Sequence, residues 1–245
     1  MEGAAVLGRL TWRVATIAEI RPETPRVKTL VLDVPGWEGH RAGQHVDVRL
    51  TAEDGFQAQR SYSIASAADG GRLELAVELI EDGAVSPYLT EEARPGDAFE
   101  LRGPIGGYFV WDPAPGGPVL LVGGGSGVVP LMAMARQRSA NGDDVATRLL
   151  YSARSWDDII YRDELERIRD GLDVVYTLTR EQPESWTGYA RRVDRELLAE
   201  VAPPDLALAF VCGPTPFVES VASALVELGH DPMRVKTERF GPTGG

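Results

Sequence analysis

The chain has 245 residues, of which 43% are hydrophobic and 25% are charged, and its formal net charge is −12. This length exceeds the roughly 100–200 residues of a typical domain and predicts two compact domains or one large one. The acidic balance argues against nucleic acid and anionic lipid as partners. The one cysteine, Cys212, excludes an internal disulfide and a four-thiolate iron–sulfur cluster within these residues.

The amino-terminal residues 1–15 lack the basic start and the apolar run of a secretory signal, so we expect a cytoplasmic protein. Residues 113–135 carry no charge and are long enough to span a membrane. Several prolines and glycines interrupt this stretch, and we interpret it as linker, strand, loop and helix. We therefore expect no membrane partner.

Five short segments in the first half alternate apolar and polar residues, with glycine and proline between them. They are residues 12–20, 26–34, 44–50, 72–80 and 97–103. This pattern is typical of a small antiparallel barrel, which we place at residues 1–112. One short helix is expected near residue 88, with Ser86 as its N-cap and Pro87 in its first turn.

The second half changes to continuous apolar runs, which follow a linker at residues 113–117. The runs are residues 118–124, 147–153, 172–179 and 207–213, and amphipathic segments at 157–168 and 217–229 alternate with them. Apolar runs without alternation suit strands that are buried on both faces of a parallel sheet. The predicted fold is an antiparallel β-barrel followed by a doubly wound α/β domain at residues 118–245.

A glycine-rich turn, Gly124-Gly125-Ser126-Gly127, lies between the first predicted strand and helix of this second half. Such a turn lets backbone amides and a helix N-terminus approach a pyrophosphate. Pro130 stands where the Rossmann fingerprint has its third glycine, a change that the first turn of a helix tolerates. The alternative interpretation is a tight turn with no ligand.

The next two predicted strands end in arginine, and no acidic residue stands at the ribose-binding position. Arg154 follows Ser152 and Ala153, and Arg180 follows Thr179. A cation beside a hydroxyl suits the 2′-phosphate of NADPH better than the two free hydroxyls of NADH. Arg191 and Arg192 are weaker candidates for the same role, and the alternative is that all these arginines are solvated surface residues. NADPH is the expected coenzyme, and NADH is possible.

Six motifs occur in a fixed order along the chain. They are Arg60-Ser61-Tyr62-Ser63, Gly83-Ala84-Val85-Ser86, residues 103–109, Gly124 to Pro130, Cys212-Gly213-Pro214 and Glu238-Arg239-Phe240. Each motif alone is weak, but their order after a barrel pattern resembles the ferredoxin–NADP⁺ reductase family across almost the whole chain. The resemblance implies a stand-alone reductase without an iron–sulfur domain.

The resemblance implies that the first two motifs hold FAD. Arg60 would pair with the flavin phosphate, a contact that suits a planar guanidinium. Tyr62 would lie against the isoalloxazine ring, and the Ser63 hydroxyl would hydrogen-bond the ring nitrogen that accepts hydride. Gly83 to Ser86 would offer backbone amides to the pyrophosphate. The alternative for this strand is a hydrated edge of the barrel.

The resemblance also places the Cys212-Gly213-Pro214 turn and Phe240 where nicotinamide meets flavin. We assign Cys212 to packing and positioning, because a lone buried cysteine usually behaves as a small apolar residue. Glu238 would be a polar or proton-handling group. Phe240 would cover the other face of the flavin, which requires residues 241–245 to turn away.

The expected activity is hydride transfer from NADPH to FAD, followed by transfer of single electrons to a separate acceptor. A ferredoxin, a flavodoxin or a redox enzyme would be that acceptor, with a free flavin or a quinone as the alternative. The rival hypothesis is an electron-transfer subunit or flavin-binding interaction module with a vestigial nucleotide site. The presence of Cys212, Glu238 and the segment Gly124 to Pro130 argues against it. The scattered His40, His45 and His230 predict no metal site.

Overall fold

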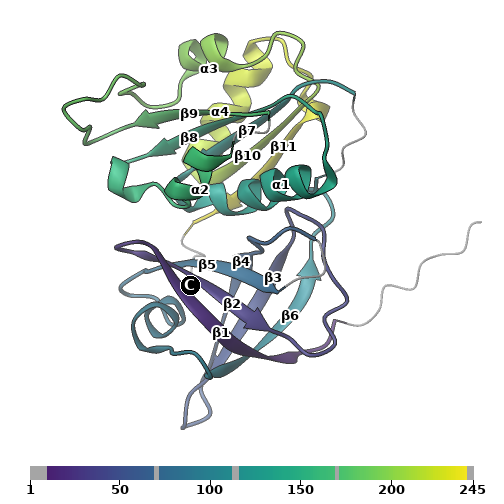
Figure 1. Ribbon diagram of the computed structural model, residues 1–245, viewed down its shortest axis with the longest axis vertical. Coiled ribbons are helices and arrows are strands. Elements are labelled where there is room, and N and C mark those ends of the chain that lie inside the picture. Colours follow the sequence, from purple (N-terminus) through teal and green to yellow (C-terminus); the bar gives the residue numbers. More distant parts are fainter. Residues whose placement is uncertain (1–9, 69–71, 112–115, 169–170, 242–245) are drawn as a thin grey trace, which may run out of the picture.

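The computed structural model describes residues 10–68, 72–111, 116–168 and 171–241. An antiparallel sheet of six strands forms the first half, and a parallel sheet of five strands with helices on both faces forms the second (Figure 1). This arrangement confirms the predicted fold class. Residues 112–115, which contain most of the predicted linker, lie outside the described residues, so the exact domain limits stay a prediction.

The first sheet closes into a barrel. Its strands are β1 (Arg13–Thr24), β2 (Val27–Asp33), β3 (His45–Thr51), β4 (Gln57–Ser63), β5 (Leu73–Glu78) and β6 (Ala98–Ile105), in the order β4-β3-β6-β1-β2-β5. An antiparallel bridge between Ile64 and Leu75 joins the two outer strands. Val46 and Val48 of β3 are fully buried inside, as period-two alternation requires, and Asp47 between them faces the other side of the strand.

A helical segment follows β5 and continues from Ser86 and Pro87 into a π-helical turn, η1 (Tyr88–Glu92). Pro87 has φ −58° and ψ −48°, so it occupies the first turn as predicted. The predicted N-cap role of Ser86 is wrong. Its hydroxyl accepts from the Ile80 N–H at 3.1 Å, so it stabilises the preceding turn and does not cap the helix.

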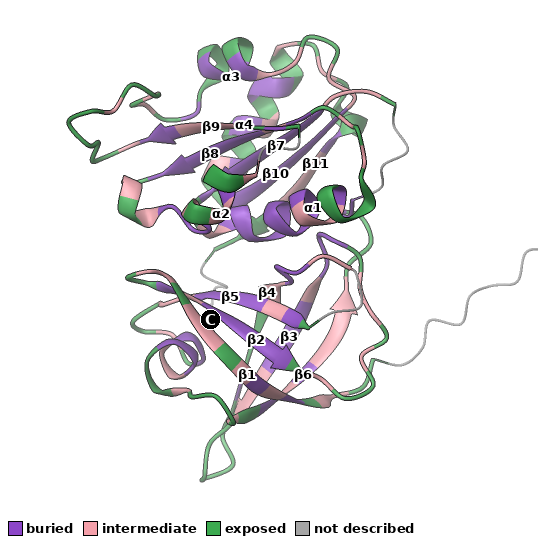
Figure 2. Cartoon of the chain, in the orientation of Figure 1, coloured by how far each residue is buried: buried purple, intermediate pink, exposed green. Residues whose placement is uncertain are grey.

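The second half alternates strands and helices. Its strands are β7 (Val119–Gly124), β8 (Thr147–Ala153), β9 (Leu172–Leu178), β10 (Leu208–Pro214) and β11 (Val235–Phe240). Its helices are α1 (Val128–Asn141), α2 (Arg162–Arg167), α3 (Arg195–Val201) and α4 (Thr215–Glu227). Three short 3₁₀ turns are η2 (Gly125–Gly127), η3 (Trp156–Asp158) and η4 (Pro232–Arg234). All strands are parallel, in the order β11-β10-β7-β8-β9. The central strands are buried on both faces (Figure 2), as their uninterrupted apolar runs predict.

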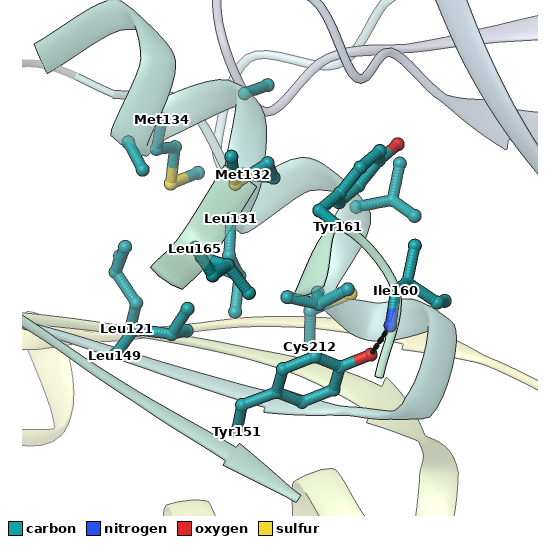
Figure 3. Close-up of a cluster of buried hydrophobic side chains, with 14 of the residues drawn as sticks. Leu121, Leu131, Met132, Met134, Leu149, Tyr151, Ile160, Tyr161, Leu165 and Cys212 are labelled. Carbon is teal, nitrogen blue, oxygen red and sulfur yellow. Dashed lines mark hydrogen bonds between the residues drawn. The ribbon is translucent and has the colours of Figure 1, made fainter. Parts of the chain in front are cut away.

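Helices α1 and α2 lie between the parallel sheet and the barrel, and α3 and α4 cover the opposite face (Figure 1). The apolar cluster around α1 includes Leu131 and Leu149 of the second half (Figure 3). It also contains Ala65 and Phe109 from the barrel side. Residues of both halves therefore share this apolar cluster, while the barrel interior and the α3 and α4 side of the parallel sheet each form a cluster of their own. Among the described residues, no helix is long and apolar enough to cross a membrane.

Candidate functional site

The candidate flavin-binding strand is β4, one of the two outer strands in the barrel order. Side chains alternate along it, so Arg60 and Tyr62 share one side and Ser61 and Ser63 share the other. Tyr62 packs against the barrel core, and burial raises the pKa of its hydroxyl. Arg60 is exposed and donates to the Gln59 carbonyl at 2.7 Å. Within the described part of the chain Arg60 has no carboxylate partner, which fits a role in binding a phosphate.

The two serines of this strand have different surroundings. Ser61 donates to Asp47 at 2.6 Å, and Arg102 lies 2.9 Å from the same carboxylate, so Ser61 belongs to a polar network on the side of β3 and β4 that faces away from the barrel interior. Ser63 lies opposite His45 in the register of β3 and β4. Tyr62 and Ser63 point to opposite sides of β4, so a flavin ring that contacted both would have to lie along an edge of this strand.

The Gly83–Ser86 segment offers fewer donors than the sequence predicts. The N–H of Gly83 donates to the Ile80 carbonyl at 2.8 Å and is not available to a ligand. The amides of Ala84, Val85 and Ser86 have no acceptor among the residues that the structure describes. A phosphate that meets this segment would therefore be held by these three amides, next to the start of the short helix.

Two strand-to-helix turns contact each other at the carboxyl edge of the parallel sheet. A Cβ atom on Gly127 would lie 2.2 Å from the Cys212 carbonyl oxygen, and one on Gly213 would lie 3.3 Å from the Gly124 carbonyl oxygen. Gly125 has φ +56°, a left-handed conformation that favours glycine. The structure therefore brings the two predicted nucleotide-binding motifs together, and their glycines make the close approach possible.

The remaining residues of these turns support the same geometry. Ser126 is half-buried in the 3₁₀ turn η2, and Pro130 is the third residue of α1, where its missing N–H costs no hydrogen bond. Pro214 ends β10 and is exposed, and α4 begins at the next residue. Both turns thus lead directly into a helix whose N-terminus faces this edge of the sheet.

Cys212 is 1% exposed and lies in the core beneath α1, in the same cluster as Leu131 and Tyr151 (Figure 3). Burial raises the pKa of its thiol well above the ordinary value, so the thiol is neutral. Gly123 of β7 and Glu238 of β11 are its neighbours in the register. This environment fits the predicted role of Cys212 in packing and positioning.

Glu238 faces the barrel. Its Oε1 lies 3.9 Å from Nδ1 of His45, and its buried Oε2 has no hydrogen-bond partner among the described residues. Burial raises the pKa of Glu238 to about 7, and burial also lowers the pKa of His45. The pair joins β3 to β11 and can hold a proton near neutral pH. In the sequence, His45 is one of three scattered histidines and predicts no metal site. Its position opposite Ser63 depends on strand pairing, which no local pattern reveals.

The end of β11 leaves the stacking role of Phe240 a prediction. Phe240 is 38% exposed and lies beside Pro214 in the register. Its neighbour Arg239 forms an ion pair of 2.6 Å with Glu219 of α4, which fixes this end of the strand. Residues 242–245, whose predicted turn away from Phe240 matters for stacking, lie outside the described residues.

Arg154 and Arg180 are neighbours at the ends of β8 and β9. The N–H groups of Arg180 and Glu181 both donate to the Arg154 carbonyl, at 2.9 and 3.1 Å. Both arginine side chains are exposed, and neither has a carboxylate partner in the described ranges. The nearby carboxylate of Asp158 is held by the Ser155 hydroxyl at 2.7 Å. The two cations therefore remain available to an anionic ligand.

Arg191 has a different environment from these two arginines. Its guanidinium lies 3.2 Å from Asp194, 3.6 Å from Glu196 and 3.5 Å from Glu200. Three carboxylates around one arginine leave it little capacity for a phosphate. Arg192 is exposed beside it.

The sequence matches two domain families and several proteins of known activity. Residues 15–110 match the oxidoreductase FAD-binding domain, and residues 121–223 match the oxidoreductase NAD-binding domain. The chain is 37% identical over 239 residues to ferredoxin–NADP reductase B of Sorangium cellulosum, which covers 92% of this chain and 96% of that protein. It is 32% identical over 209 residues to the glycine betaine monooxygenase reductase subunit of Pseudomonas aeruginosa, covering 83% of this chain but only 57% of that protein.

Solved structures show the same architecture. The cytochrome P450 reductase GcoB of Amycolatopsis is similar with a TM-score of 0.84 and 26% identity, over 98% of this chain and 74% of that one. A ferredoxin NADP⁺ reductase of Neisseria gonorrhoeae shares the fold with a TM-score of 0.80 and 21% identity, over 94% of this chain and 98% of that one. With the two matching domains and the extensive identity to a ferredoxin–NADP reductase, this chain belongs to the ferredoxin–NADP reductase family of FAD-dependent NAD(P)H oxidoreductases.

Proposed function

We propose that this reductase takes its hydride from NADPH in preference to NADH and delivers electrons to a separate redox protein. When bound, FAD supplies the chemistry, because it accepts a hydride and releases the electrons singly. The protein binds and orients the reactants and controls protons around them. The observation that carries the coenzyme preference is the pair of arginines, Arg154 and Arg180, which lie at the carboxyl edge of the parallel sheet and have no carboxylate partner among the described residues.

Four groups on the barrel are proposed to hold FAD. Arg60 binds a phosphate, since its guanidinium is exposed and has no carboxylate partner within the described residues. The amides of Ala84 to Ser86 bind the other phosphate of the pyrophosphate. Tyr62 provides a fixed aromatic surface, and the Ser63 hydroxyl, which has no hydrogen-bond partner in the described part of the chain, faces the ring edge.

The nicotinamide is proposed to lie between the two contacting turns and the barrel. Cys212 and Gly213 leave room for the nicotinamide beside these turns, because a neutral thiol and a glycine occupy little volume and add no charge. Glu238 and His45 hold one proton between the two domains, next to the Ser63 side of β4. Phe240 covers the site from the end of β11.

The 2′-phosphate of NADPH carries the charge that distinguishes it from NADH. Two exposed guanidinium groups at the adenosine end of the site would bind this phosphate by charge-assisted hydrogen bonds. The names of the relatives include both an NADP reductase and an NADH oxidoreductase, so the family alone is compatible with either coenzyme. The preference therefore rests on Arg154 and Arg180.

A double variant tests this preference. We expect Arg154→Ala, Arg180→Ala to lower the efficiency of flavin reduction by NADPH at least about a hundredfold and to leave NADH nearly unchanged, because two charge-assisted contacts are lost. Arg148→Ala, Arg195→Ala removes the same charge elsewhere in the α/β domain and serves as the control. Equal losses with both coenzymes would show that Arg154 and Arg180 serve the shared pyrophosphate or the fold, and the preference for NADPH would be withdrawn.

The acceptor is proposed to be a ferredoxin, a flavodoxin or a redox enzyme. Two relatives are named as the glycine betaine monooxygenase reductase subunit and as methane monooxygenase component C, and both names describe one part of a multi-protein oxygenase, which supports this class of partner. The net charge of −12 means that a strongly acidic acceptor needs a local basic patch for docking. We place the protein in the cytoplasm, where NADPH is available.

A further inference from the structure

One arginine on α1 contacts both halves of the molecule. The side chain of Arg136 is only 16% exposed, although it is charged. Its guanidinium donates to the Ala65 carbonyl at 2.8 Å and to a Glu74 carboxylate oxygen at 3.0 Å, both on the barrel. On the other side it donates to both carboxylate oxygens of Glu164, at 2.8 and 2.6 Å, within the α/β half.

The barrel groups that Arg136 contacts belong to the flavin-binding region. Ala65 comes two residues after Ser63, and its N–H donates to the Glu74 carbonyl at 2.8 Å, so the two acceptors are tied to each other. Glu74 also forms an ion pair with Arg21 of β1. The end of the strand that carries Tyr62 and Ser63 is thus held by the same network that holds Arg136.

The α/β side of the contact is equally well fixed. The Arg136 guanidinium lies 4.7 Å from the centre of the Tyr161 ring. Tyr161 is 3% exposed and has φ +59°, and its hydroxyl is turned away from the parallel sheet (Figure 3). A non-glycine residue in this left-handed conformation requires strong surrounding contacts. Tyr161 and Glu164 together confine Arg136 to one orientation.

Helix α1 connects this contact to the nucleotide turn. The helix begins directly after Gly127, and Arg136 is its ninth residue, on a segment whose first eight residues are all buried. A buried, packed helix of this length transmits the position of one end to the other. The network around Arg136 therefore links the helix that follows the glycine-rich turn to the end of β4.

We infer that Arg136 is a positioning residue for hydride transfer, which fixes the distance between the coenzyme-binding turn and the flavin-binding strand. The inference rests on the proposed function, since that places coenzyme and flavin at these two elements. Hydride transfer is sensitive to displacements of about 1 Å, which can lower a rate about a hundredfold. Lysine cannot replace the arginine fully, because it lacks the planar fork that reaches Glu74, Ala65 and Glu164 together.

Three variants of the full chain test this role. Arg136→Met removes every donor, and Arg136→Lys keeps the charge. Arg148→Met is the control, because Arg148 likewise donates to a carboxylate, Asp173 at 2.6 Å, and to a carbonyl, Val201 at 2.7 Å, but both partners lie within the α/β half.

For Arg136→Met we expect the anaerobic rate of flavin reduction at saturating NADPH to fall at least about tenfold, while flavin content and NADP⁺ affinity stay within about twofold of wild type. Arg136→Lys should recover part of the rate, and Arg148→Met should equal the wild type. A reduced rate accompanied by equal losses of flavin and NADP⁺ affinity would show general support of the fold and overturn the inference.

Hydrogen exchange provides a readout that needs no coenzyme. We expect amides at residues 64–66 and 134–141 to exchange faster in Arg136→Met than in wild type or in Arg148→Met, because the contact between the halves loosens. If Arg136→Met showed wild-type hydrogen exchange and a wild-type rate of flavin reduction, the positioning role would be contradicted and the proposed function would stand. A wild-type protein that neither NADPH nor NADH reduces would instead contradict the proposed function.

Discussion

At the scale of single residues, Arg60 is the side chain on which flavin binding depends most directly. It is an exposed cation beside Tyr62, and no carboxylate among the described residues competes for it. We expect Arg60→Ala to lower flavin affinity about tenfold to a hundredfold, because one charge-assisted contact to a phosphate is lost. Fluorimetric titration of the apoprotein with FAD measures the effect.

The control for this prediction is Arg13→Ala, which removes a barrel arginine that donates to the Pro35 carbonyl at 3.5 Å. It should bind FAD as wild type does. If Arg60→Ala and Arg13→Ala both retained wild-type affinity, the phosphate would lie elsewhere on the barrel.

Glu238 gives the molecule a pH dependence of stability. Burial raises its pKa from the ordinary 4.5 to about 7, so the folded state holds this proton more tightly than the unfolded state does. The free energy of unfolding therefore falls as the pH rises from about 4.5 to about 7 and does not change further above that. Glu238→Gln removes this titration.

Urea unfolding of wild type and Glu238→Gln between pH 5 and pH 8 measures the difference. We expect the glutamine variant to gain about 1–3 kcal/mol relative to wild type as the pH rises to 7, with a constant difference above it. Stability curves that stay parallel over this range would show that Glu238 is not protonated in the folded protein at pH 6.

Which residues the sequence could predict depends on whether their partners are local. The Arg60-Ser61-Tyr62-Ser63 motif is a contiguous pattern, and the structure places it at the end of β4. The partner of Ser61, Asp47, lies 14 residues earlier on the paired strand β3, and the partner of Glu238, His45, lies on β3 in the other half of the molecule. Their contacts depend on strand register and domain packing, and a single sequence contains no local signal for either.

At the scale of elements, the contact between the glycine-rich turn and the Cys212-Gly213-Pro214 turn is the feature most sensitive to one added atom. A Cβ on Gly127 would lie 2.2 Å from the Cys212 carbonyl oxygen and 2.8 Å from the Gly213 Cα, both backbone atoms that cannot rotate away. We expect Gly127→Ala to separate β7 from β10, to cost about 1–3 kcal/mol of stability and to weaken coenzyme binding.

Thermal unfolding and NADP⁺ titration of Gly127→Ala measure these two effects. Ser126→Ala, one residue earlier in the same turn, is the matched control and should keep wild-type stability. Wild-type coenzyme affinity in Gly127→Ala would mean that the close approach of the turns serves folding alone.

The elements that the sequence predicted well are those with a strong pattern. The apolar runs of β7, β8 and β10 and the alternation of β2 and β3 each identify a strand. The edge strand β11 has the mixed sequence VKTERF, and α3 has only seven residues, so neither shows a clear period. The prediction that Ser86 caps the short helix is wrong because its hydroxyl accepts from the Ile80 N–H in the preceding turn, a contact that a local rule does not consider.

At the scale of the whole molecule, the account depends on two halves that cooperate in one reaction. The barrel carries the proposed flavin site, the parallel sheet carries the proposed coenzyme site, and α1, the shared core and the Glu238 and His45 pair lie between them. A change from alternating to continuous apolar patterning near residue 112 made both halves predictable from the sequence. The way in which they are held together, above all through Arg136, became visible only in the structure.

The central claim is that both halves are active in the same molecule, and it distinguishes a reductase from a flavin-binding module with a vestigial nucleotide site. Anaerobic titration of the purified, FAD-loaded protein with NADPH, followed at the flavin absorbance, tests it most directly. The account predicts complete bleaching with about one equivalent of NADPH, since each hydride carries the two electrons that one flavin accepts. A protein that binds FAD but keeps its full flavin absorbance with excess NADPH and excess NADH would contradict it.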